Sequence, residues 1–317
     1  MTTTQKIKIT IKRLLLFSKQ LLSFFYKIFL NINIVKPKII VRMDGGISSQ
    51  IHQYLIGRIF SEKGYTVTYE LSFYKYWAKD NNGCFQRNFD LLKAFPYLEF
   101  KKSNWVDSIV YPLRFADKTD FFDHEDEDVF LYDLQPPKYL GRYYHSPKDV
   151  WKVLFPNYFH VDPQILDKYS YSLYTEIIKN SCSIGVHVRR GDLAVHNNAY
   201  GAPASFDYFF KAVSYFYSKI TTPFFYFFSD EPQWVEKELI EKLPVIDNQY
   251  KIVNKNGSDK GYMDLFLLAS CAHQITSKGS FGKLGALLSE SKDKIVILNN
   301  DSLEYGWKDL LINPVYI

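Results

Sequence analysis

The stretch Ile184-Gly-Val-His-Val-Arg-Arg-Gly-Asp192 decides the fold predicted for this chain. Its branched apolar residues alternate with smaller or polar ones, which is typical of a strand with a buried face. These residues are Ile184, Val186 and Val188. The two arginines, the glycine and the aspartate that follow are typical of a strand end and a turn. The stretch therefore predicts a buried strand that ends in a charged loop.

Arg189 and Arg190 lie where a ligand would bind, because ligands of open α/β sheets occupy the crevice beyond the carboxyl ends of the strands. A guanidinium is planar and permanently charged, and it matches a phosphate or carboxylate with two parallel hydrogen bonds. The alternative interpretation is structural: both arginines are surface residues, and one of them pairs with Asp192. The short motif alone favours neither interpretation.

The second half of the chain alternates between strands and helices. We expect helices at 206–220, 233–242, 262–272 and 284–289, and strands at 224–228, 245–246, 251–253, 274–276 and 295–298. The run Phe224-Phe-Tyr-Phe-Phe228 is too uninterrupted for a half-exposed strand and indicates an interior parallel strand. This alternation predicts a parallel α/β domain.

The first half opens with a similar unit. We expect a strand at 38–43, a glycine-bearing turn at 44–50, a helix at 50–63, a strand at 67–71, and a later helix at 148–154 that ends at Phe155-Pro156. A helix N-terminus after Gly45 and Gly46 suits an anion or a sugar hydroxyl, although most double-glycine turns are only structural. We therefore divide the chain into an N-terminal segment, 1–36, and two α/β domains, 37–155 and 156–317.

The N-terminal segment combines lysines with large apolar residues. Lys12, Lys19, Ser23 and Lys27 fall on one helical face, and most large apolar residues fall on the other. The lysines argue against a membrane-spanning helix, and no small-residue cleavage site follows, as a signal peptide would require. A basic amphipathic helix in the membrane interface fits this pattern, and a helix packed on the protein's own surface is the alternative. We expect a peripheral protein on the cytoplasmic face of the inner membrane, or a cytoplasmic one.

Composition excludes several classes of protein. A chain of 317 residues with 47% hydrophobic and 23% charged residues is globular and has room for two domains. The net charge of +5 is too small for a nucleic-acid-binding surface. The widely spaced Cys84, Cys182 and Cys271 argue against a disulfide framework or a cysteine zinc site. The acidic run at 120–128 suggests a solvated loop more strongly than a metal site.

Four blocks of the chain, in order, resemble the alpha-1,2-fucosyltransferases of glycosyltransferase family 11. Gly45-Gly-Ile-Ser-Ser-Gln-Ile-His-Gln-Tyr54 is similar to the family's GGLGNQMFQY, and His187-Val-Arg-Arg-Gly-Asp192 matches H-x-R-R-G-D. Phe228-Ser-Asp230 is similar to FSDD. The segment from Asp264 to Ala286 resembles D-x-x-L-M-x-x-C-K-H followed by S-x-F-S-W-W-G-A. The blocks extend over most of the chain, from about residue 40 to residue 290.

The resemblance implies a GT-B fold of two Rossmann-like domains, an acceptor-side N-terminal one and a donor-binding C-terminal one. It also implies GDP-fucose as the donor substrate, inversion at the anomeric carbon, and neither a metal ion nor another cofactor. The residue chemistry agrees, because the departing diphosphate must be stabilised by a divalent cation or by fixed cationic donors. No Asp-x-Asp or histidine cluster is convincing, whereas Arg189 and Arg190 stand at a strand end.

The resemblance also assigns candidate site residues. We expect Arg189 to contact the β-phosphate, Arg190 to support it or hold the loop, and Asp192 to orient the arginines or the turn rather than to abstract a proton. Candidate donor-binding residues are His187, Ser229, Asp230, Asp264, Ser280 and Phe281, and candidate acceptor-side residues are Gly45, Gly46, Gln50 and His52. Asp44, His52 and His196 are open candidates for the general base. Structural alternatives remain: His187 as a buried histidine, Asp264 as a helix N-terminal charge and Ser280 as a cap.

Departures from the family pattern concern the acceptor most. Ser48 and Ser49 replace Gly-Asn, His52 replaces Phe, and Gly282-Lys-Leu284 replaces Ser-Trp-Trp. We expect transfer of L-fucose to O2 of a galactoside in a cell-surface or lipid-linked glycan. The rest of the acceptor's structure stays open. The alternatives are another acceptor for the same donor, and a non-catalytic nucleotide-sugar-binding protein on the same fold.

Overall fold

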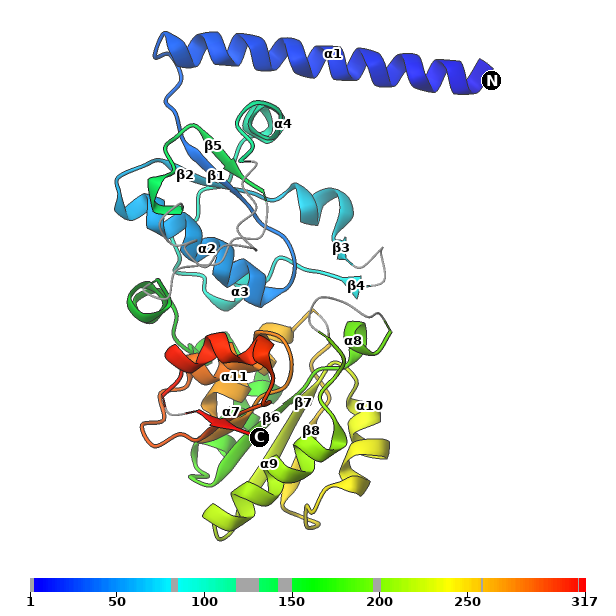
Figure 1. Ribbon diagram of the computed structural model, residues 1–317, viewed down its shortest axis with the longest axis vertical. Helices are drawn as coiled ribbons and strands as arrows, with labels where there is room; N and C mark the ends of the chain where they lie inside the picture. Colours follow the sequence, from blue (N-terminus) through cyan, green and yellow to red (C-terminus); the bar gives the residue numbers. More distant parts are fainter. Residues whose placement is uncertain are drawn as a thin grey trace. The chain divides into compact units, whose positions relative to one another are not determined.

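The computed structural model of the chain describes residues 3–80, 85–117, 131–141, 150–195, 201–257, 259–312 and 314–317 (Figure 1). The chain divides into two compact units. Unit 1 comprises Met1–Asp44, Ser49–Ala78 and Glu99–Val150, and unit 2 comprises Gly45–Ser48, Lys79–Leu98 and Trp151–Ile317. Two short segments from the first half thus cluster with the second, so the uninterrupted domains 37–155 and 156–317 remain an interpretation of the chain.

Unit 1 is built on a small parallel sheet. Its elements are α1 (Thr3–Asn31), β1 (Ile39–Arg42), α2 (Ile47–Glu62, whose first residues belong to unit 2), β2 (Val67–Glu70), a π-helical turn η1 (Phe73–Trp77), α4 (Trp105–Arg114) and β5 (Lys138–Leu140). The strand order is β2-β1-β5, and Ile39 lies opposite both Val67 and Lys138. The predicted strand, helix and strand after residue 37 are confirmed, whereas α4 and β5 lie where no element was predicted.

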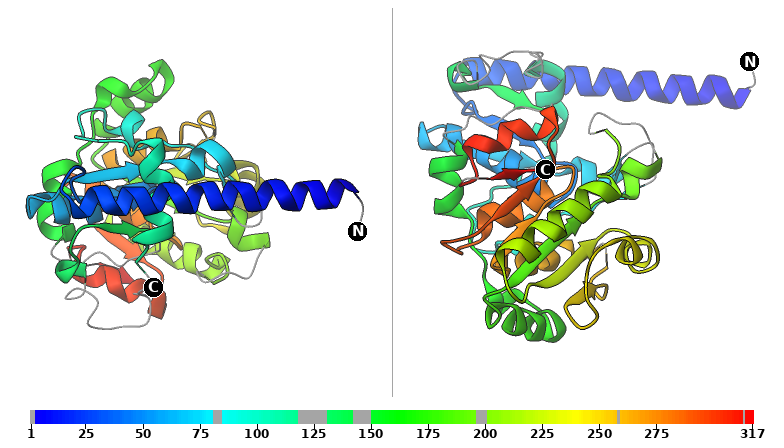
Figure 2. Two further views of the ribbon diagram at one scale, coloured as in Figure 1. Left: turned by 90° about the horizontal axis from the view of Figure 1, so that it is seen from above. Right: turned by 60° about the horizontal axis from the view of Figure 1, so that its bottom comes forward.

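The helix α1 packs on α4 through its C-terminal third, where Leu22, Tyr26 and Leu30 contact Val110 and Tyr111. Polar bonds strengthen this contact: the hydroxyl of Tyr26 donates to Asp107 Oδ1 at 2.8 Å, and Arg114 Nε donates to Ser23 Oγ at 2.9 Å. Lys38 Nζ also donates to Asp107, at 2.7 Å. Figures 1 and 2 show α1 as one unbroken rod. Within the described part of the chain, no helix has the length and apolarity to cross a bilayer.

Unit 2 is built on a six-stranded sheet. Its short N-terminal elements are β3 (Lys79–Asp80), β4 (Phe85–Gln86), α3 (Leu91–Ala94), η3 (Val150–Leu154, mostly in unit 2), α6 (Phe155–Tyr158) and η4 (Pro163–Ile165). Then follow α7 (Lys168–Ile178), β6 (Ser183–Val188), α8 (Gly191–Val195), α9 (Phe206–Lys219), β7 (Phe224–Ser229), α10 (Pro232–Trp234), η5 (Val235–Leu239), η6 (Ile240–Lys242), β8 (Tyr250–Val253), α11 (Gly261–Ser270), β9 (His273–Ile275), α12 (Phe281–Leu288), β10 (Val296–Leu298), η7 (Ser302–Asp309) and β11 (Val315–Tyr316). The order β11-β10-β9-β6-β7-β8 is parallel throughout, which confirms the predicted parallel α/β class.

Both faces of this sheet are covered by helices, and this explains its fully buried strands. On one face, residues of β6 such as Ile184 and Val186 pack with α9 and with η5. On the other face, Tyr226 and Phe228 of β7 pack with α7 and α11. Every residue of β6 is buried. The sheet therefore fixes the end of β6, from which Arg189 and Arg190 continue.

Three sequence expectations differ from the structure. Residues 245–246 form no strand, because Pro244 lacks an amide hydrogen and a turn with Asn248 at φ 68° follows directly. Phe155-Pro156 does not end the preceding helix: it opens α6, where a proline fits because the first helical amides need no partner. The turn expected at Gly191-Asp192 is the start of the short helix α8.

Candidate functional site

The guanidinium of Arg189 is fixed by two groups just beyond β6. Its Nε and Nη2 donate to the two carboxylate oxygens of Asp192 at 3.1 and 2.6 Å, which is a bidentate pair. Burial acts to raise the pKa of Asp192, but the hydrogen bond and charge of Arg189, with the charge of Arg87 and a backbone hydrogen bond, together hold the pKa below its ordinary value. Asp192 is therefore an anion that orients Arg189 and is a poor proton acceptor at neutral pH.

The second constraint on Arg189 is the loop after β9. The backbone N–H of Arg189 donates to Ser277 Oγ at 2.9 Å. Gly279 has φ 78°, and a Cβ added there would lie 2.5 Å from Arg189 Nη1. The backbone of this loop thus lies directly against the guanidinium, and only glycine permits that approach without strain.

Arg190 holds a different loop, the one after β7. Its backbone N–H donates to Asp230 Oδ1 at 3.0 Å, and its Nε donates to Glu231 Oε2 at 3.0 Å. Its guanidinium also lies 3.8 Å from the centre of the Trp234 ring. Ser229 Oγ accepts from the Glu231 N–H at 3.0 Å. These contacts favour the loop-holding role for Arg190, and donor binding by Ser229 and Asp230 remains a prediction.

His187 is buried, with 6% of its surface exposed, beneath the same loop as Arg189. Its Nδ1 lies 3.1 Å from Ser277 Oγ, and its ring stacks on Phe281 at 5.3 Å between centroids. Burial, with the charges of Lys283 and Arg189, holds its pKa far below the ordinary value, so the ring is neutral. A Cβ at Gly282 would lie 2.8 Å from Nδ1. The structural alternative of a satisfied buried histidine therefore fits this geometry, and a donor-binding role is still a prediction.

Ser280 occupies the N-cap position of α12, but its side chain makes no capping hydrogen bond. The structural alternative, a capping hydroxyl that accepts a hydrogen bond from an amide of the first turn, is therefore not formed, and phosphate binding by Ser280 remains a prediction. Phe281 is the first residue of α12 and the stacking partner of His187. The residues predicted at positions 187, 189, 192, 280 and 281 come together around one loop, Ser277–Gly282.

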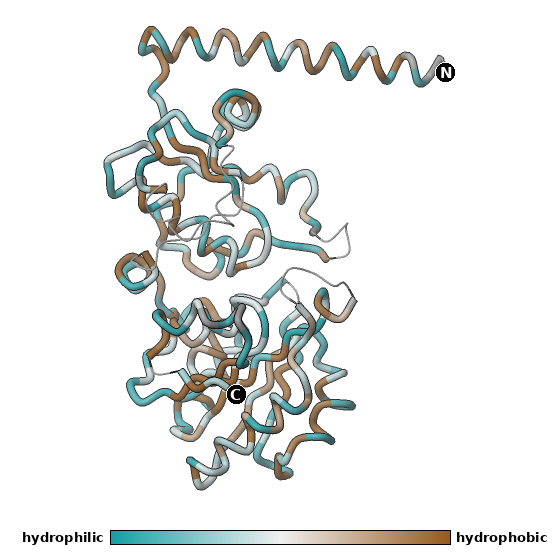
Figure 3. Tube along the Cα trace, in the orientation of Figure 1, coloured by the Kyte–Doolittle hydropathy of each residue, from teal (hydrophilic) through white to brown (hydrophobic). Residues whose placement is uncertain are grey.

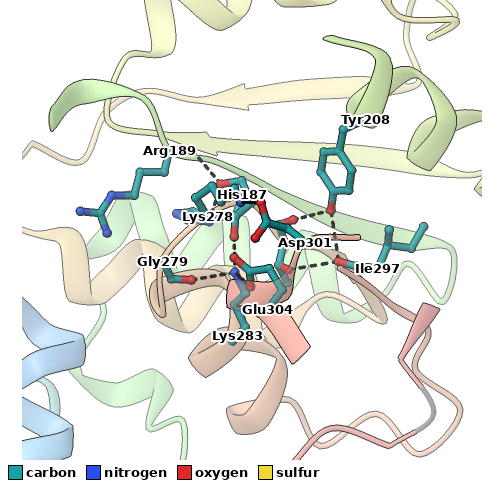
Figure 4. A network of polar contacts seen from close by, with 11 residues as sticks. His187, Arg189, Tyr208, Lys278, Gly279, Lys283, Ile297, Asp301 and Glu304 are labelled. Carbon is teal, nitrogen blue, oxygen red and sulfur yellow. Dashed lines mark hydrogen bonds and ion pairs between the residues drawn. The ribbon is translucent and has the colours of Figure 1, made fainter. Parts of the chain in front are cut away.

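Two lysines, Lys278 of this loop and Lys283 of α12, were not assigned a role from the sequence (Figure 4). Lys278 forms an ion pair with Asp301, and Lys283 forms one with Glu304 at 2.5 Å. Lys283 also donates to the backbone oxygens of Ser277 and Gly279, the latter at 2.8 Å. A lysine in place of an aromatic family residue was the signal at position 283, whereas nothing in the sequence pointed to Glu304.

Asp264 lies in the first turn of α11 and accepts a hydrogen bond from Asn256 Nδ2 at 2.7 Å. Burial raises its pKa to about 7, and the bond from Asn256 opposes that rise. Ser170 Oγ in turn donates to Asn256 Oδ1 at 3.3 Å. Asn256 is a neighbour that sequence reasoning missed. A carboxyl group titrating near neutrality fits a binding role as well as a helix-terminal charge, so both interpretations stay open.

The candidate acceptor-side residues are divided between the units. Gly45, at φ 71°, and Gly46 belong to unit 2, and a Cβ at Gly46 would lie 3.9 Å from Arg87 Nη1. Gln50 and His52 lie on α2 in unit 1, where Gln50 is fully buried and His52 is half-buried. The assignment of all four to an acceptor site remains a prediction.

The candidate general bases have different surroundings. Asp44 Oδ1 accepts from Gln53 Nε2 at 2.7 Å, and its Oδ2 lies 3.4 Å from Arg42 Nε.

His196, the acidic run at 120–128 and Cys84 lie outside the described residues. Within the described ranges, no three His, Cys, Asp or Glu side chains gather as metal ligands would.

Comparison with known proteins gives one family match. The model of glycosyl transferase family 11 matches residues 121–308. A curated relative, the O-antigen biosynthesis glycosyltransferase WbnK of Escherichia coli, is 27% identical over 128 residues, which cover 39% of this chain. The match spans about two fifths (41%) of the relative's own length.

Solved structures resemble the chain only weakly. The alpha-1,6-fucosyltransferase NodZ co-crystallised with GDP has a TM-score of 0.43 and 16% identity, covering 80% of this chain and 93% of its own. Selenomethionyl NodZ from Bradyrhizobium has a TM-score of 0.45 and 17% identity, covering 80% and 92%. TM-scores below 0.5 add nothing to the fold described above.

Proposed function

This chain belongs to glycosyl transferase family 11, and from that premise we propose that it transfers L-fucose from GDP-fucose to O2 of a galactosyl acceptor in a cell-surface glycan. We propose inversion at the anomeric carbon, no metal requirement, and a GT-B arrangement of the two units. The observation that carries the proposal is the held guanidinium of Arg189 at the carboxyl end of β6. A fixed cation at this edge of a parallel sheet suits a diphosphate ligand.

The proposed reaction breaks the bond between the fucosyl C1 and the β-phosphate oxygen of GDP-fucose. The acceptor O2 forms the new bond from the opposite face of the sugar, and its proton passes to a base or to water. The leaving GDP gains negative charge on its β-phosphate, which Arg189 would stabilise without moving, because Asp192 and the Gly279 backbone already hold it. Asp192 would serve as the orienting group and His187 as a neutral wall of the nucleotide site.

The first test measures GDP release from GDP-fucose with lactose as acceptor and EDTA present. We expect turnover by the intact protein and a loss of about 10²–10³ in rate for Arg189→Ala. Arg58→Ala is the matched control, because Arg58 pairs with Glu62 at 2.9 Å and with Glu99 at 3.4 Å, both residues of unit 1. Its rate should be unchanged.

Other outcomes select the alternatives. Turnover with other acceptors but with no galactoside would keep GDP-fucose as donor and overturn the proposed acceptor, where Ser48, Ser49 and His52 depart from the family pattern. Tight GDP-fucose binding without turnover on any acceptor would support a non-catalytic binding protein. Loss of activity in EDTA that Mg²⁺ restores would overturn the metal-free mechanism.

We also propose that α1 lies in the interface of an anionic membrane. The face of α1 that packs on α4 carries Leu22, Ser23, Tyr26 and Leu30. The opposite face is an exposed apolar stripe, defined by Leu14, Phe17, Leu21, Phe24, Phe25 and Ile28. The alternative from sequence, a helix packed on the protein's own surface, describes the C-terminal third of α1, whereas Leu14 and Phe17 of the stripe are 63% and 64% exposed.

The charge of α1 favours an anionic surface. Its sequence contains Lys6, Lys8, Lys12, Arg13, Lys19 and Lys27 and no Asp or Glu, and the alternation of polar and apolar residues is visible along its length in Figure 3. Basic residues beside an anionic membrane contribute about 1 kcal/mol each. An acceptor carried on a lipid would place the substrate at the same surface, and the name of the Escherichia coli relative, an O-antigen glycosyltransferase, agrees with such an acceptor.

Vesicle flotation tests the membrane proposal. The intact protein should float with vesicles containing anionic lipid and much less with neutral ones. Phe17→Asp/Phe25→Asp should abolish flotation, whereas Phe206→Asp, an exposed aromatic of unit 2, should not. Deletion of residues 1–21 is preferable to deletion of 1–36, because it keeps Tyr26 in contact with Asp107. The shortened protein keeps Phe24, Phe25 and Ile28 of the stripe, so its flotation should weaken, and undiminished flotation with anionic vesicles would refute the proposal.

A further inference from the structure

The loop Ser277–Gly282 is held from beneath by a buried ion pair. Lys283 has none of its surface exposed and Glu304 only 2%, and their charged atoms are 2.5 Å apart. The pair connects the first turn of α12 to η7, a segment twenty-one residues later in the chain. Such a pair stabilises little by itself, since desolvation of two charges offsets their attraction. A contribution to global stability therefore does not explain why this ion pair lies beneath the loop.

The ammonium of Lys283 links that pair to Arg189 in two steps. It donates to the backbone oxygens of Ser277 and Gly279. The same Ser277 accepts the backbone N–H of Arg189 through its hydroxyl, and the same Gly279 lies against the Arg189 guanidinium. Figure 4 shows Lys283, Gly279 and Arg189 around this loop. One buried cation thus holds the two loop residues, Ser277 and Gly279, that contact Arg189 in addition to Asp192.

A second ion pair joins the same loop to the same C-terminal segment. Lys278, which is 5% exposed, pairs with Asp301, and the Glu304 N–H donates to the Asp301 backbone oxygen at 2.9 Å. The carboxylates also balance a local excess of positive charge. Burial, together with the charges of Lys278 and Arg189, lowers the pKa of Lys283 to about 8, whereas Glu304 opposes the change.

We infer that Lys283 and Glu304 are positioning residues for the anion site, which hold the Ser277–Gly279 loop and through it the backbone and guanidinium of Arg189. The inference rests on the proposed function in one respect, that the anion is the diphosphate of GDP. It also explains the lysine at position 283, where the family pattern has an aromatic residue, because the lysine replaces packing with two hydrogen bonds to the loop backbone.

The test compares Lys283→Met/Glu304→Leu with Lys294→Met. The double variant removes both charges together, which avoids an unpaired buried charge. Lys294 is a matched control, because it too donates to two backbone oxygens, those of Ala286 and Ser289, but at the other end of α12. We measure amide hydrogen exchange at Arg189, whose N–H is bonded to Ser277, and GDP affinity by calorimetry.

In the double variant, the amide hydrogen of Arg189 should exchange on the order of tenfold faster, because the loop that holds it loses the two hydrogen bonds from Lys283 to its backbone. Its GDP affinity should fall by a similar factor, and Lys294→Met should change neither. Unchanged exchange in the double variant, or unchanged GDP affinity despite faster exchange, would overturn the inference. A parent protein that binds GDP without transferring fucose would count against the proposed function alone, since exchange and affinity are measured without transfer.

Discussion

Replacing Gly279 by alanine should displace Arg189 without altering any charged group. The new methyl carbon would lie 2.5 Å from Arg189 Nη1, so the nitrogen must retreat by roughly 1 Å to reach an ordinary contact. The guanidinium is the far end of a flexible side chain, so this retreat costs little stability. It does break the bidentate geometry with Asp192, and a misplacement of about 1 Å can reduce a rate about 10²-fold.

Gly64→Ala separates this effect from backbone strain. Gly64 has φ 81°, close to the 78° of Gly279, and an added Cβ there would meet nothing within 4 Å. Both variants should lose about 1–2 kcal/mol of unfolding free energy in urea, the cost of a left-handed conformation for an L-residue. Only Gly279→Ala should lose turnover in the GDP-release assay, by about 10²-fold. Equal rates for the two variants would refute the idea that the loop backbone positions Arg189.

Three further predictions follow from single contacts. Asp264→Asn should flatten the pH dependence of stability between about pH 4 and 7. Burial raises the pKa of Asp264 in the folded protein to about 7, so the native state binds the proton more tightly than the unfolded state and the parent protein loses stability as pH rises through that window. Urea unfolding at about pH 4 and at about pH 7 would show the difference between the two proteins. Trp234→Leu should lower turnover about two- to fivefold, since it removes the ring 3.8 Å beneath the Arg190 guanidinium, and an unchanged rate would exclude a role for that contact. Tyr26→Phe should lower the urea stability of unit 1 by about 1 kcal/mol through loss of the bond to Asp107, with vesicle flotation unchanged.

The elements that could be predicted from the sequence are those whose pattern is local. The buried strand before Arg189 and the helix at 206–220 are set by neighbours in the chain, and both were found within a residue or two of their bounds. The strand predicted at residues 245–246 was wrong, because their apolar side chains were given more weight than the adjacent Pro244.

The contacts that could not be predicted join residues far apart in sequence. The Arg189–Asp192 pair is three residues apart and was named as one alternative from the motif. The Lys283–Glu304 pair and the Tyr26–Asp107 bond, 81 residues apart, are set by the folded chain alone. The motif therefore indicated the Arg189–Asp192 pair, whereas the contacts that hold the Ser277–Gly279 loop against Arg189 depend on the folded chain.

Because α1 packs on α4 only through its C-terminal third, it can determine how unit 1 is oriented on a membrane surface. The bonds of Tyr26 and Ser23 to α4 prevent the helix from rolling about its own axis relative to unit 1. If the stripe from Leu14 to Ile28 inserts into lipid, unit 1 has one fixed orientation relative to the bilayer plane. The helix would then set this orientation, so that a lipid-borne sugar would always approach the same side of unit 1.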